Sequence, residues 1–567
     1  MREEPFFEIG LCMAGAVSAG AYTAGVMDYL VETLDKWEQA RATNDPTVPA
    51  HKVRISILSG ASAGGMTAMI TAAALQNKLP PINLQYRTDE AYKKQNKLYN
   101  TWVNLVADDM IPEMLSYSDL KKGTKARSFL NSDFIDRLAD DALQCCQNDG
   151  TQRNYFAPDL ELLVSLSNIA GIPYELGFIS NARVSSRYKT RAHGDYGHFI
   201  ITNTVEEAAS LIDKGRIPLS FIHNINIDIA RDCAKATGAF PVGLAARQVS
   251  RNKLFVENNS ILNKHYHSQN RKMSIPDPYI TVNVDGGMID NEPFSVTRCL
   301  LLNRTQETDA ANKDYKTFKS CVLMVDPFPS EEVEKDFNFE TAFNLDTSVA
   351  NIIKTMRSQL MFRPDDIEEA MDPNNASRFM IAPKRTTNGN AYHGSRAIAC
   401  GCLGGFGGFI NKSFRMHDYF LGRRNCQHFL RQRFTIPLEN ITGNTVTADN
   451  ILNPLFKAGY SNPQAIQRFI TKDGNALPII PDMDYYNHQP FNKEETYLPW
   501  PTISSKYLQS IHPLLKQRIE KVMLSLAPPK DRFLLWLGSR ALLRRKIAAA
   551  IINWLQKDLN GHELIKE

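Results

Sequence analysis

The sequence lacks the features that mark several large classes of protein. It has no C-x-x-C pair, and its nine cysteines are an odd number, so neither a disulfide framework nor a zinc site is expected. A reducing compartment fits this cysteine usage better. No strong excess of charge is present, because 65 basic residues against 61 acidic ones leave a net charge of +4. A nucleic-acid partner is therefore not indicated.

Long hydrophobic runs are also missing. The most apolar stretches, AMITAAAL and KIAAAIINWL, are far shorter than the ~20 residues that a membrane-spanning helix needs. The beginning, MREEPFFEIGLCMAGAV, does not resemble a signal peptide, because two acidic residues precede an apolar run that predicts a strand. We therefore expect a cytoplasmic protein whose contact with a membrane, if it has one, is peripheral.

The pattern of apolar residues predicts an α/β fold. Short apolar runs that end at turn residues predict buried strands at 6–13, 53–59, 160–168, 279–285 and 320–326. Helical patterns separate them, and the clearest lie at 21–37, 64–78 and 205–215. This alternation is typical of a mostly parallel sheet flanked by helices on both faces.

The alternation of strands and helices stops after DPFPS, and a chain of 567 residues is too long for one ordinary core. We place a domain boundary near residue 330, between an α/β domain of residues 1–330 and a mainly helical C-terminal domain of residues 331–567. Within the first domain, the polar, Lys- and Tyr-rich residues 81–158 are predicted to form a helical insertion.

The stretch GASAG, residues 60–64, follows a predicted strand and opens a predicted helix. In this context G-x-S-x-G predicts a nucleophile elbow, in which a strained turn presents the Ser62 hydroxyl. Small neighbours let the two backbones pass closely, and the positive end of the helix favours negative charge developing beside the serine. The alternative is a tight turn in which small residues merely fit.

A serine hydroxyl needs a base before it becomes a good nucleophile, and Asp285 is the candidate. It ends the strand at 279–285 and meets Gly286 and Gly287, and the carboxyl ends of parallel strands are where α/β sheets build their sites. A simple Asp-Gly turn is the alternative role. A Ser-His-Asp triad is a further alternative, although its α/β-hydrolase fold places several strands before the elbow and only one is predicted here. The downstream histidines are His393, His417, His428, His488, His512 and His562.

The loop after the first strand is rich in small residues. Gly15, Gly20 and Gly25 recur between a predicted strand and a predicted helix, and such a loop can present several backbone amides to an anion. Close helix–sheet packing is the alternative, and it is the interpretation we prefer for Gly25. A dinucleotide-binding loop is disfavoured, because Val17 occupies the place of the second glycine of that fingerprint.

These three elements, in this order, resemble the patatin-like phospholipase family. ATGAFPVGLAAR at 236–247 and DGGMIDNEP at 285–293 extend the resemblance, which covers roughly residues 8–300. It implies the patatin-like fold and a lipid acyl hydrolase that acts on phospholipids or other lipid esters without a metal or other cofactor. It also implies that Ser62 is the nucleophile, that Asp285 is the base, and that an oxyanion hole and a set of motif glycines surround them. The implied oxyanion-hole amides are those of Gly15, Ala16, Val17 and Ala63, and the motif glycines are Gly60, Gly64, Gly286 and Gly287.

One departure from the family lies in the oxyanion loop, residues 15–20. The family usually has G-G-G-x-R-G, whereas this chain has alanine at position 19 in place of the arginine and Ala16 and Val17 in place of glycines. The amides remain, but any anchoring by the arginine is lost. Because valine resists a positive φ, we expect a different loop backbone. A non-catalytic membrane-associated scaffold on a degraded patatin fold is accordingly the alternative function.

The second half of the chain permits two interpretations at each of three places. Residues 400–430 resemble the C-terminal region of a bacterial subgroup of patatin-related proteins. Their glycines and phenylalanines suit an acyl site or, as we expect, a packed turn; these are Gly404, Gly405, Phe406, Gly407, Gly408 and Phe409. The charged and titratable side chains that follow could either bind a phosphate headgroup or form a buried salt network. They are Arg415, His417, Asp418, Arg423 and Arg424. The last predicted helix, 531–559, suits an anionic membrane interface or docking on its own domain.

Overall fold

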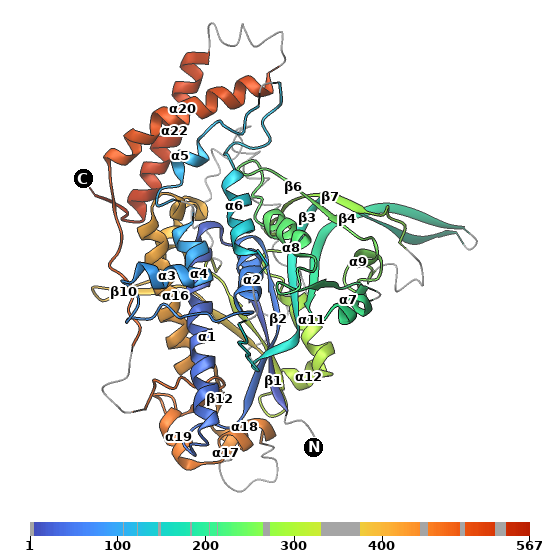
Figure 1. Ribbon diagram of the computed structural model, residues 1–567, viewed down its shortest axis with the longest axis vertical. Coiled ribbons are helices and arrows are strands. Elements are labelled where there is room, and N and C mark those ends of the chain that lie inside the picture. Colours follow the sequence, from blue (N-terminus) through green and yellow to red (C-terminus); the bar gives the residue numbers. More distant parts are fainter. Residues whose placement is uncertain are drawn as a thin grey trace.

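The computed structural model describes residues 5–105, 107–121, 123–145, 149–181, 184–202, 204–212, 214–264, 273–329, 375–442, 452–487, 494–527 and 540–566. Within these residues the centre of the molecule is a nine-stranded sheet (Figure 1). Its path runs β5-β4-β3-β2-β1-β8-β9, while β7 pairs with β3 and β6 pairs with β7. The strands are β1 (Phe6–Met13), β2 (Lys52–Gly60), β3 (Phe156–Asn181), β4 (Val184–Ile201), β5 (Ile217–Leu219), β6 (Arg247–Arg251), β7 (Tyr279–Asp285), β8 (Ser320–Val325) and β9 (Arg378–Ile381).

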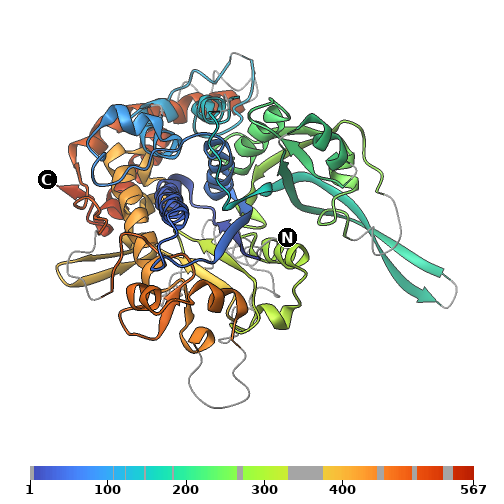
Figure 2. The same cartoon turned by 60° about the horizontal axis from the view of Figure 1, so that its bottom comes forward.

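The core of the sheet is parallel, which confirms the predicted fold class. Strands β1, β2, β3, β8 and β9 pair in parallel, as do β4 and β5. The pairs β3–β4, β3–β7 and β6–β7 are antiparallel. Strands β3 and β4 continue past the sheet as a long two-stranded ribbon that projects from the body (Figure 2).

Helices cover both faces of the sheet, because successive side chains of its central strands alternate between two apolar clusters. Leu11 and Leu58 belong to the cluster that includes α1 (Gly20–Ala42), α2 (Ser62–Ala74) and α16 (Lys412–Gln432). Cys12 and Ile57 point to the other face, which α11 (Phe294–Thr305) covers. Two of these helices, α1 and α2, and a third helix, α7 (Val205–Ile212), confirm the helices predicted at 21–37, 64–78 and 205–215.

The insertion at 81–158 is helical only in part. Its described residues form α3 (Glu90–Gln95), α4 (Lys97–Tyr99), a π-helix (Asn100–Asn104), α5 (Ile111–Met114) and α6 (Asp133–Ala142), which are joined by loops. Between the sheet strands that follow lie α8 (Ile227–Thr237), α9 (Leu254–Glu257) and α12 (Asp309–Asn312).

The described residues after 374 are mainly helical and share the core of the first half. Strand β9 extends the central sheet beside β8, and α16 packs along α1 (Figure 1). The boundary predicted near residue 330 falls within 330–374, outside the described residues, and stays a prediction. None of the described helices has the length and apolar content needed to cross a bilayer. The remaining elements are β10 (Lys384–Thr387), β11 (Asn390–His393), β12 (Thr435–Pro437), α17 (Glu439–Thr442), α18 (Pro454–Gly459), α19 (Pro463–Phe469), β13 (Ala476–Pro478), β14 (Ile503–Ser504), α20 (Lys506–Leu526), α22 (Arg540–Gly561) and β15 (Ile565–Lys566).

Helices α1 and α16 cross at two glycines. A Cβ atom added to Gly25 would lie 1.9 Å from the carbonyl oxygen of Tyr419, and one added to Gly422 would lie 2.2 Å from that of Tyr22. The interpretation of Gly25 as a helix–sheet contact was therefore wrong, because the backbone that approaches it belongs to another helix. The two helices lie far apart in the sequence, so no local sequence pattern could predict this contact.

This crossing predicts a stability effect. We expect Gly25→Ala to lower the free energy of unfolding by about 1–3 kcal/mol, because the backbones must move apart to admit the methyl group. Gly561→Ala is the matched control, since a Cβ there meets no atom within 4 Å. Denaturant melts of both variants test the contact, and equal midpoints for the two would contradict it.

Candidate active site

Ser62 lies in a strained turn between β2 and α2. Its φ is +50°, in the region that non-glycine residues rarely adopt, and its side chain is buried. The Ser62 amide donates to the Thr237 hydroxyl at 2.8 Å, and its own hydroxyl donates to Oδ2 of Asp285 at 2.6 Å. The strand–turn–helix context predicted for GASAG is therefore present.

The motif glycines around Ser62 allow backbones to meet. A Cβ on Gly60 would lie 2.5 Å from the carbonyl carbon of Gly64, and a Cβ on Gly64 would lie 2.0 Å from the carbonyl oxygen of Met13. The turn is thus pressed against the end of β1. This contact also points the N-terminus of α2, with its partial positive charge, toward the serine hydroxyl.

Asp285 is held from several directions. Its Oδ1 accepts from the Gly287 amide at 2.8 Å, while its own amide donates to the Ala239 carbonyl at 2.9 Å. The Ser167 hydroxyl donates to the Asp285 carbonyl at 2.8 Å. The residue is therefore both a turn former and the partner of Ser62, so the two roles predicted as alternatives coexist.

The strand that carries Asp285 runs in the opposite sense from the one expected. Strand β7 is antiparallel to both β3 and β6, so Asp285 does not end a parallel strand. In the register, Asp285 faces Leu166 of β3, two residues beyond Val164, which faces Gly60 of β2. The aspartate reaches Ser62 because β7 approaches the carboxyl edge of the sheet from outside and stops there.

The oxyanion loop brings backbone amides to the same place. The Gly15 amide is engaged, since it donates to the Asn291 carbonyl at 3.3 Å. The amides of Ala16, Val17 and Ala63 have no acceptor in the part of the chain that the structure describes. These three amides are therefore available to an anion.

Val17 adopts a φ of +48°. A β-branched residue is strained in this region, so the preference of valine for negative φ is overridden here. That the loop backbone differs from that of the family stays a prediction. Some contact must hold the loop in this conformation.

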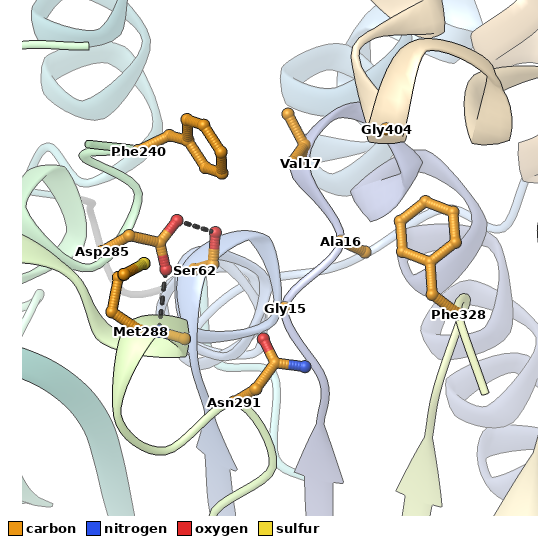
Figure 3. Close-up of a pocket in the computed structure, with 11 residues that line it drawn as sticks. Gly15, Ala16, Val17, Ser62, Phe240, Asp285, Met288, Asn291, Phe328 and Gly404 are labelled. Carbon is orange, nitrogen blue, oxygen red and sulfur yellow. Dashed lines mark hydrogen bonds between the residues drawn. The ribbon is translucent and has the colours of Figure 1, made fainter. Parts of the chain in front are cut away.

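A small pocket opens in front of the Ser62–Asp285 pair. Figure 3 shows the two side chains pointing at each other, with Val17 and Gly404 across from them. Apart from this pair, most of the residues that line the pocket are apolar. The lining residues are Gly15, Ala16, Val17, Ser62, Phe240, Asp285, Gly287, Met288, Asn291, Phe328 and Gly404. The pocket thus combines a serine–carboxylate pair with mostly apolar walls.

Sequence reasoning missed two residues of the site. Thr237 fixes the Ser62 amide, and Asn291 lies against Gly15 and Gly287, where an added Cβ would come within 2.4 and 2.5 Å of its Oδ1. Both stand in segments whose resemblance to the family was recognised, at 236–247 and 285–293. A role could not be assigned to either, because no local pattern tells which side chain faces the serine.

The glycines at 404–408 are mainly a packed turn. Gly407 and Gly408 are buried, where a Cβ would meet the sulfur atoms of Cys402 and Cys400, at 2.2 and 2.7 Å. Only Gly404 of this group lines the pocket. The packed-turn interpretation is confirmed, with one residue that also borders the site.

The charged cluster after residue 411 is a buried network. Arg423 pairs with Asp28 and Glu32 of α1 and with Glu495. Burial by itself would raise the pKa of Glu32, but the neighbouring cations Arg423 and Lys36 lower this pKa to about 2. Arg423 is thus an internal counter-ion between α1 and α16.

Within the described residues, Arg415 is bonded to backbone carbonyls and not to carboxylates. It donates to the carbonyls of Val103 and Ala107 at 2.8 and 2.9 Å, and burial lowers the pKa of its guanidinium to about 10. Its guanidinium is therefore buried and taken up by the protein backbone, so Arg415 is not part of the salt network and does not face an open headgroup site.

None of the described histidines is hydrogen-bonded to Ser62 or lines the pocket. His417 is buried in α16 and bonded to Asp418, and His562 is bonded to the Asp558 carbonyl. His488 lies outside the described residues. Among the described residues there is also no group of three or more His, Cys, Asp or Glu side chains arranged to hold a metal ion.

Comparison with known proteins agrees with this geometry. Residues 11–298, about half of the chain, match the family model described as patatin-like phospholipase. The uncharacterized protein y4iI of Sinorhizobium fredii is 33% identical in an alignment 482 residues long that covers 76% of this chain. The chain spans 65% of that relative's length.

The geometry predicts a selectively reactive serine. We expect an alkyl fluorophosphonate probe to label the protein at Ser62, because its hydroxyl faces a carboxylate beside unoccupied amides. Ser62→Ala should abolish labelling, whereas the matched variant Ser59→Ala, which removes a buried hydroxyl of β2 bonded to Thr297, should keep it. Peptide mapping of the label identifies the residue, and a label on another serine would contradict the assignment.

Proposed function

Because the chain belongs to the patatin-like phospholipase family, we propose that it is a lipid acyl hydrolase that cleaves carboxylic esters through an acyl intermediate on Ser62. One observation carries the proposal. The Ser62 hydroxyl, in a positive-φ turn at a helix N-terminus, donates to the Asp285 carboxylate at 2.6 Å. A serine–aspartate dyad needs this direct contact.

In the proposed reaction Asp285 is the general base. Its Oδ2 takes the proton as Ser62 Oγ attacks the ester carbonyl, and it returns the proton to the departing alcohol. In the second half it takes a proton from the water that attacks the acyl-serine, and it returns this proton to Ser62 Oγ as the ester bond to the serine breaks and the carboxylic acid leaves. The Gly287 amide and the Ala239 carbonyl keep the carboxylate aimed at the serine throughout.

The oxyanion that forms would lie against backbone amides. Those of Ala16 and Val17 come from the oxyanion loop, and that of Ala63 from the first turn of α2. The Gly15 amide is left out, because it already donates to Asn291. Donors that are fixed in a buried pocket cost little reorganisation when charge develops, so they stabilise the transition state strongly.

Two alternative functions lose support from the same geometry. A Ser-His-Asp triad needs a histidine at the serine, and none of the described ones is there. A scaffold on a degraded fold needs neither an intact dyad nor unoccupied amides beside it. The departures at Ala16, Val17 and Ala19 leave the backbone donors in place, so they do not by themselves argue for a loss of activity.

We further propose contact with an anionic membrane through α22, the described part of the tail at 531–559. Its inner face packs on α20, where Ala548 meets Leu515 and Ile519. Its outer face exposes Trp554 together with basic residues, which are Arg545, Lys546 and Lys557. A tryptophan among cations suits the headgroup region of a lipid surface. The described cysteines are all free, which suits the cytoplasmic location that we propose.

The dyad predicts the effect of an isosteric change. Asp285→Asn should lower the turnover of a p-nitrophenyl acyl ester by ~10²–10⁴-fold or more, because an amide cannot take the proton. Asn fills the same volume and tolerates the same turn, so the melting temperature should change little. Turnover at saturating ester is measured beside a thermal melt, and near-normal turnover with an unchanged melt would refute the dyad even if Ser62 proved essential.

The membrane contact has its own test. Reversing Arg545, Lys546 and Lys557 to Glu should weaken binding to phosphatidylserine-containing vesicles at low salt by at least tenfold, since each cation near the surface contributes about 1 kcal/mol. Hydrolysis of the soluble ester should not change. The control reverses the exposed Lys214, Lys264 and Lys319 instead. Equal vesicle binding by both triple variants would exclude α22 as the contact.

A further inference from the structure

A loop from the C-terminal half of the chain lies directly on the oxyanion loop. This glycine loop, residues 399–409, follows β11 and has three consecutive residues with positive φ: Leu403 at +57°, Gly404 at +63° and Gly405 at +95°. Gly404 borders the pocket beside Val17 (Figure 3). A Cβ added to Gly405 would lie 3.2 Å from the Val17 side chain.

Ser18 joins the two loops. Its hydroxyl donates to the Gly405 carbonyl at 2.5 Å and accepts from the Gly408 amide at 2.9 Å. The side chain is buried, and a Cβ added to Gly408 would come within 2.7 Å of its Oγ. One hydroxyl thus satisfies two backbone groups of a segment that is separated from it by almost 390 residues.

The glycine loop is itself held at two other points. The Leu403 amide donates to Oδ2 of Asp558, in α22, at 2.6 Å. The Arg415 guanidinium donates to the Gly408 carbonyl and also to a carbonyl of the insertion. The glycine loop, to which Ser18 is bonded, is therefore fixed to the rest of the molecule and can hold Ser18 in place.

The oxyanion loop needs such an anchor. Val17 is β-branched and has a φ of +48°, a conformation that persists only when the surroundings enforce it. Position 19 is an alanine, whose methyl group cannot hydrogen-bond. Ser18 is the residue between these two, and its two bonds oppose a return of Val17 to negative φ, which would change the backbone of the loop that lines the pocket.

We propose that Ser18 is a positioning residue that fastens the oxyanion loop to the glycine loop, so that the C-terminal half of the chain completes the oxyanion hole. This inference rests on the proposed hydrolase function. It assigns to residues 399–409 and to Asp558 of α22 a positioning role, although neither supplies a group to the reaction.

The test replaces the Ser18 hydroxyl and a matched hydroxyl elsewhere. Ser18→Ala should lower kcat for a p-nitrophenyl acyl ester at least tenfold and change KM by less than twofold, because misplaced amides weaken only the transition state. Ser320→Ala is the control: its hydroxyl, at the far end of β8, is buried and likewise donates one bond, to Glu307, and accepts one, from Asn312. This variant should have the kcat of the wild type.

The remote anchor provides a second arm that does not depend on the folding of the Ser18 variant. Asp558→Ala removes the acceptor of the Leu403 amide and should lower kcat, whereas Asp558→Asn keeps a carbonyl oxygen there and should restore it. A merely structural role would lower the melting temperature of both Ala variants and leave kcat of the folded enzyme intact, and this result would overturn the inference.

The outcomes separate this inference from the proposed function. A wild-type protein that neither hydrolyses the ester nor reacts with a fluorophosphonate overturns both. An active wild type with unchanged kcat in Ser18→Ala and Asp558→Ala overturns only the positioning role. A drop in kcat with both Ala variants and recovery in Asp558→Asn supports both.

Discussion

The backbone of the Ser62 turn passes so close to the end of β1 that no side chain fits between them. The Cα atom of Gly64 lies against the Met13 carbonyl, and that of Gly60 lies against Gly64. This contact forces the sharp turn, and the turn gives Ser62 its positive φ. It also brings the loop that leaves β1 in front of the first amides of α2. The geometry of the nucleophile and of its surrounding amides therefore has one steric cause.

The second constraint is the approach of β7 from outside the parallel sheet. A strand that belonged to the parallel set would need a crossover helix to place its end at the same edge. Strand β7 instead pairs antiparallel with the extended β3 and stops where β2 ends, and Gly286 lets its backbone meet that of Ser165. The point at which the β3–β7 pairing ends therefore places Asp285 beside Ser62. The hydrogen bond from the Gly287 amide then fixes the Asp285 side chain.

The two halves of the chain are interdependent around this site. The α1–α16 crossing, with its paired glycines and the buried Arg423, fixes the C-terminal half against the sheet. From there the segment at 399–409 reaches back to Ser18 and the pocket. Because α16 begins shortly after this segment, the buried contacts of Arg423 and Arg415 also hold the segment in place.

The sequence by itself determined the class of fold and most of the sheet strands, and it singled out Ser62 and Asp285, which the structure brings into contact. The run 6–13 coincides with β1, because a buried strand must be apolar and must end at residues that can turn. The run 279–285 coincides with β7, but this strand is not buried on both faces, since Ile280 and Val282 are exposed. The Ser62 turn was predictable for a similar reason, since glycines at fixed spacing report a close approach of backbones. Each of these signals is local.

Only the tertiary structure decided what depends on long-range contacts. The direction of β7, the partner of Gly25, the occupied Gly15 amide and the roles of Thr237 and Asn291 all involve groups far apart in the chain. Val17 shows the limit most clearly. Its intrinsic preference for negative φ is a correct local property, but it is overridden where Ser18 is bonded to a loop almost 390 residues away. No pattern within a strand or a helix carries information about a contact of that separation.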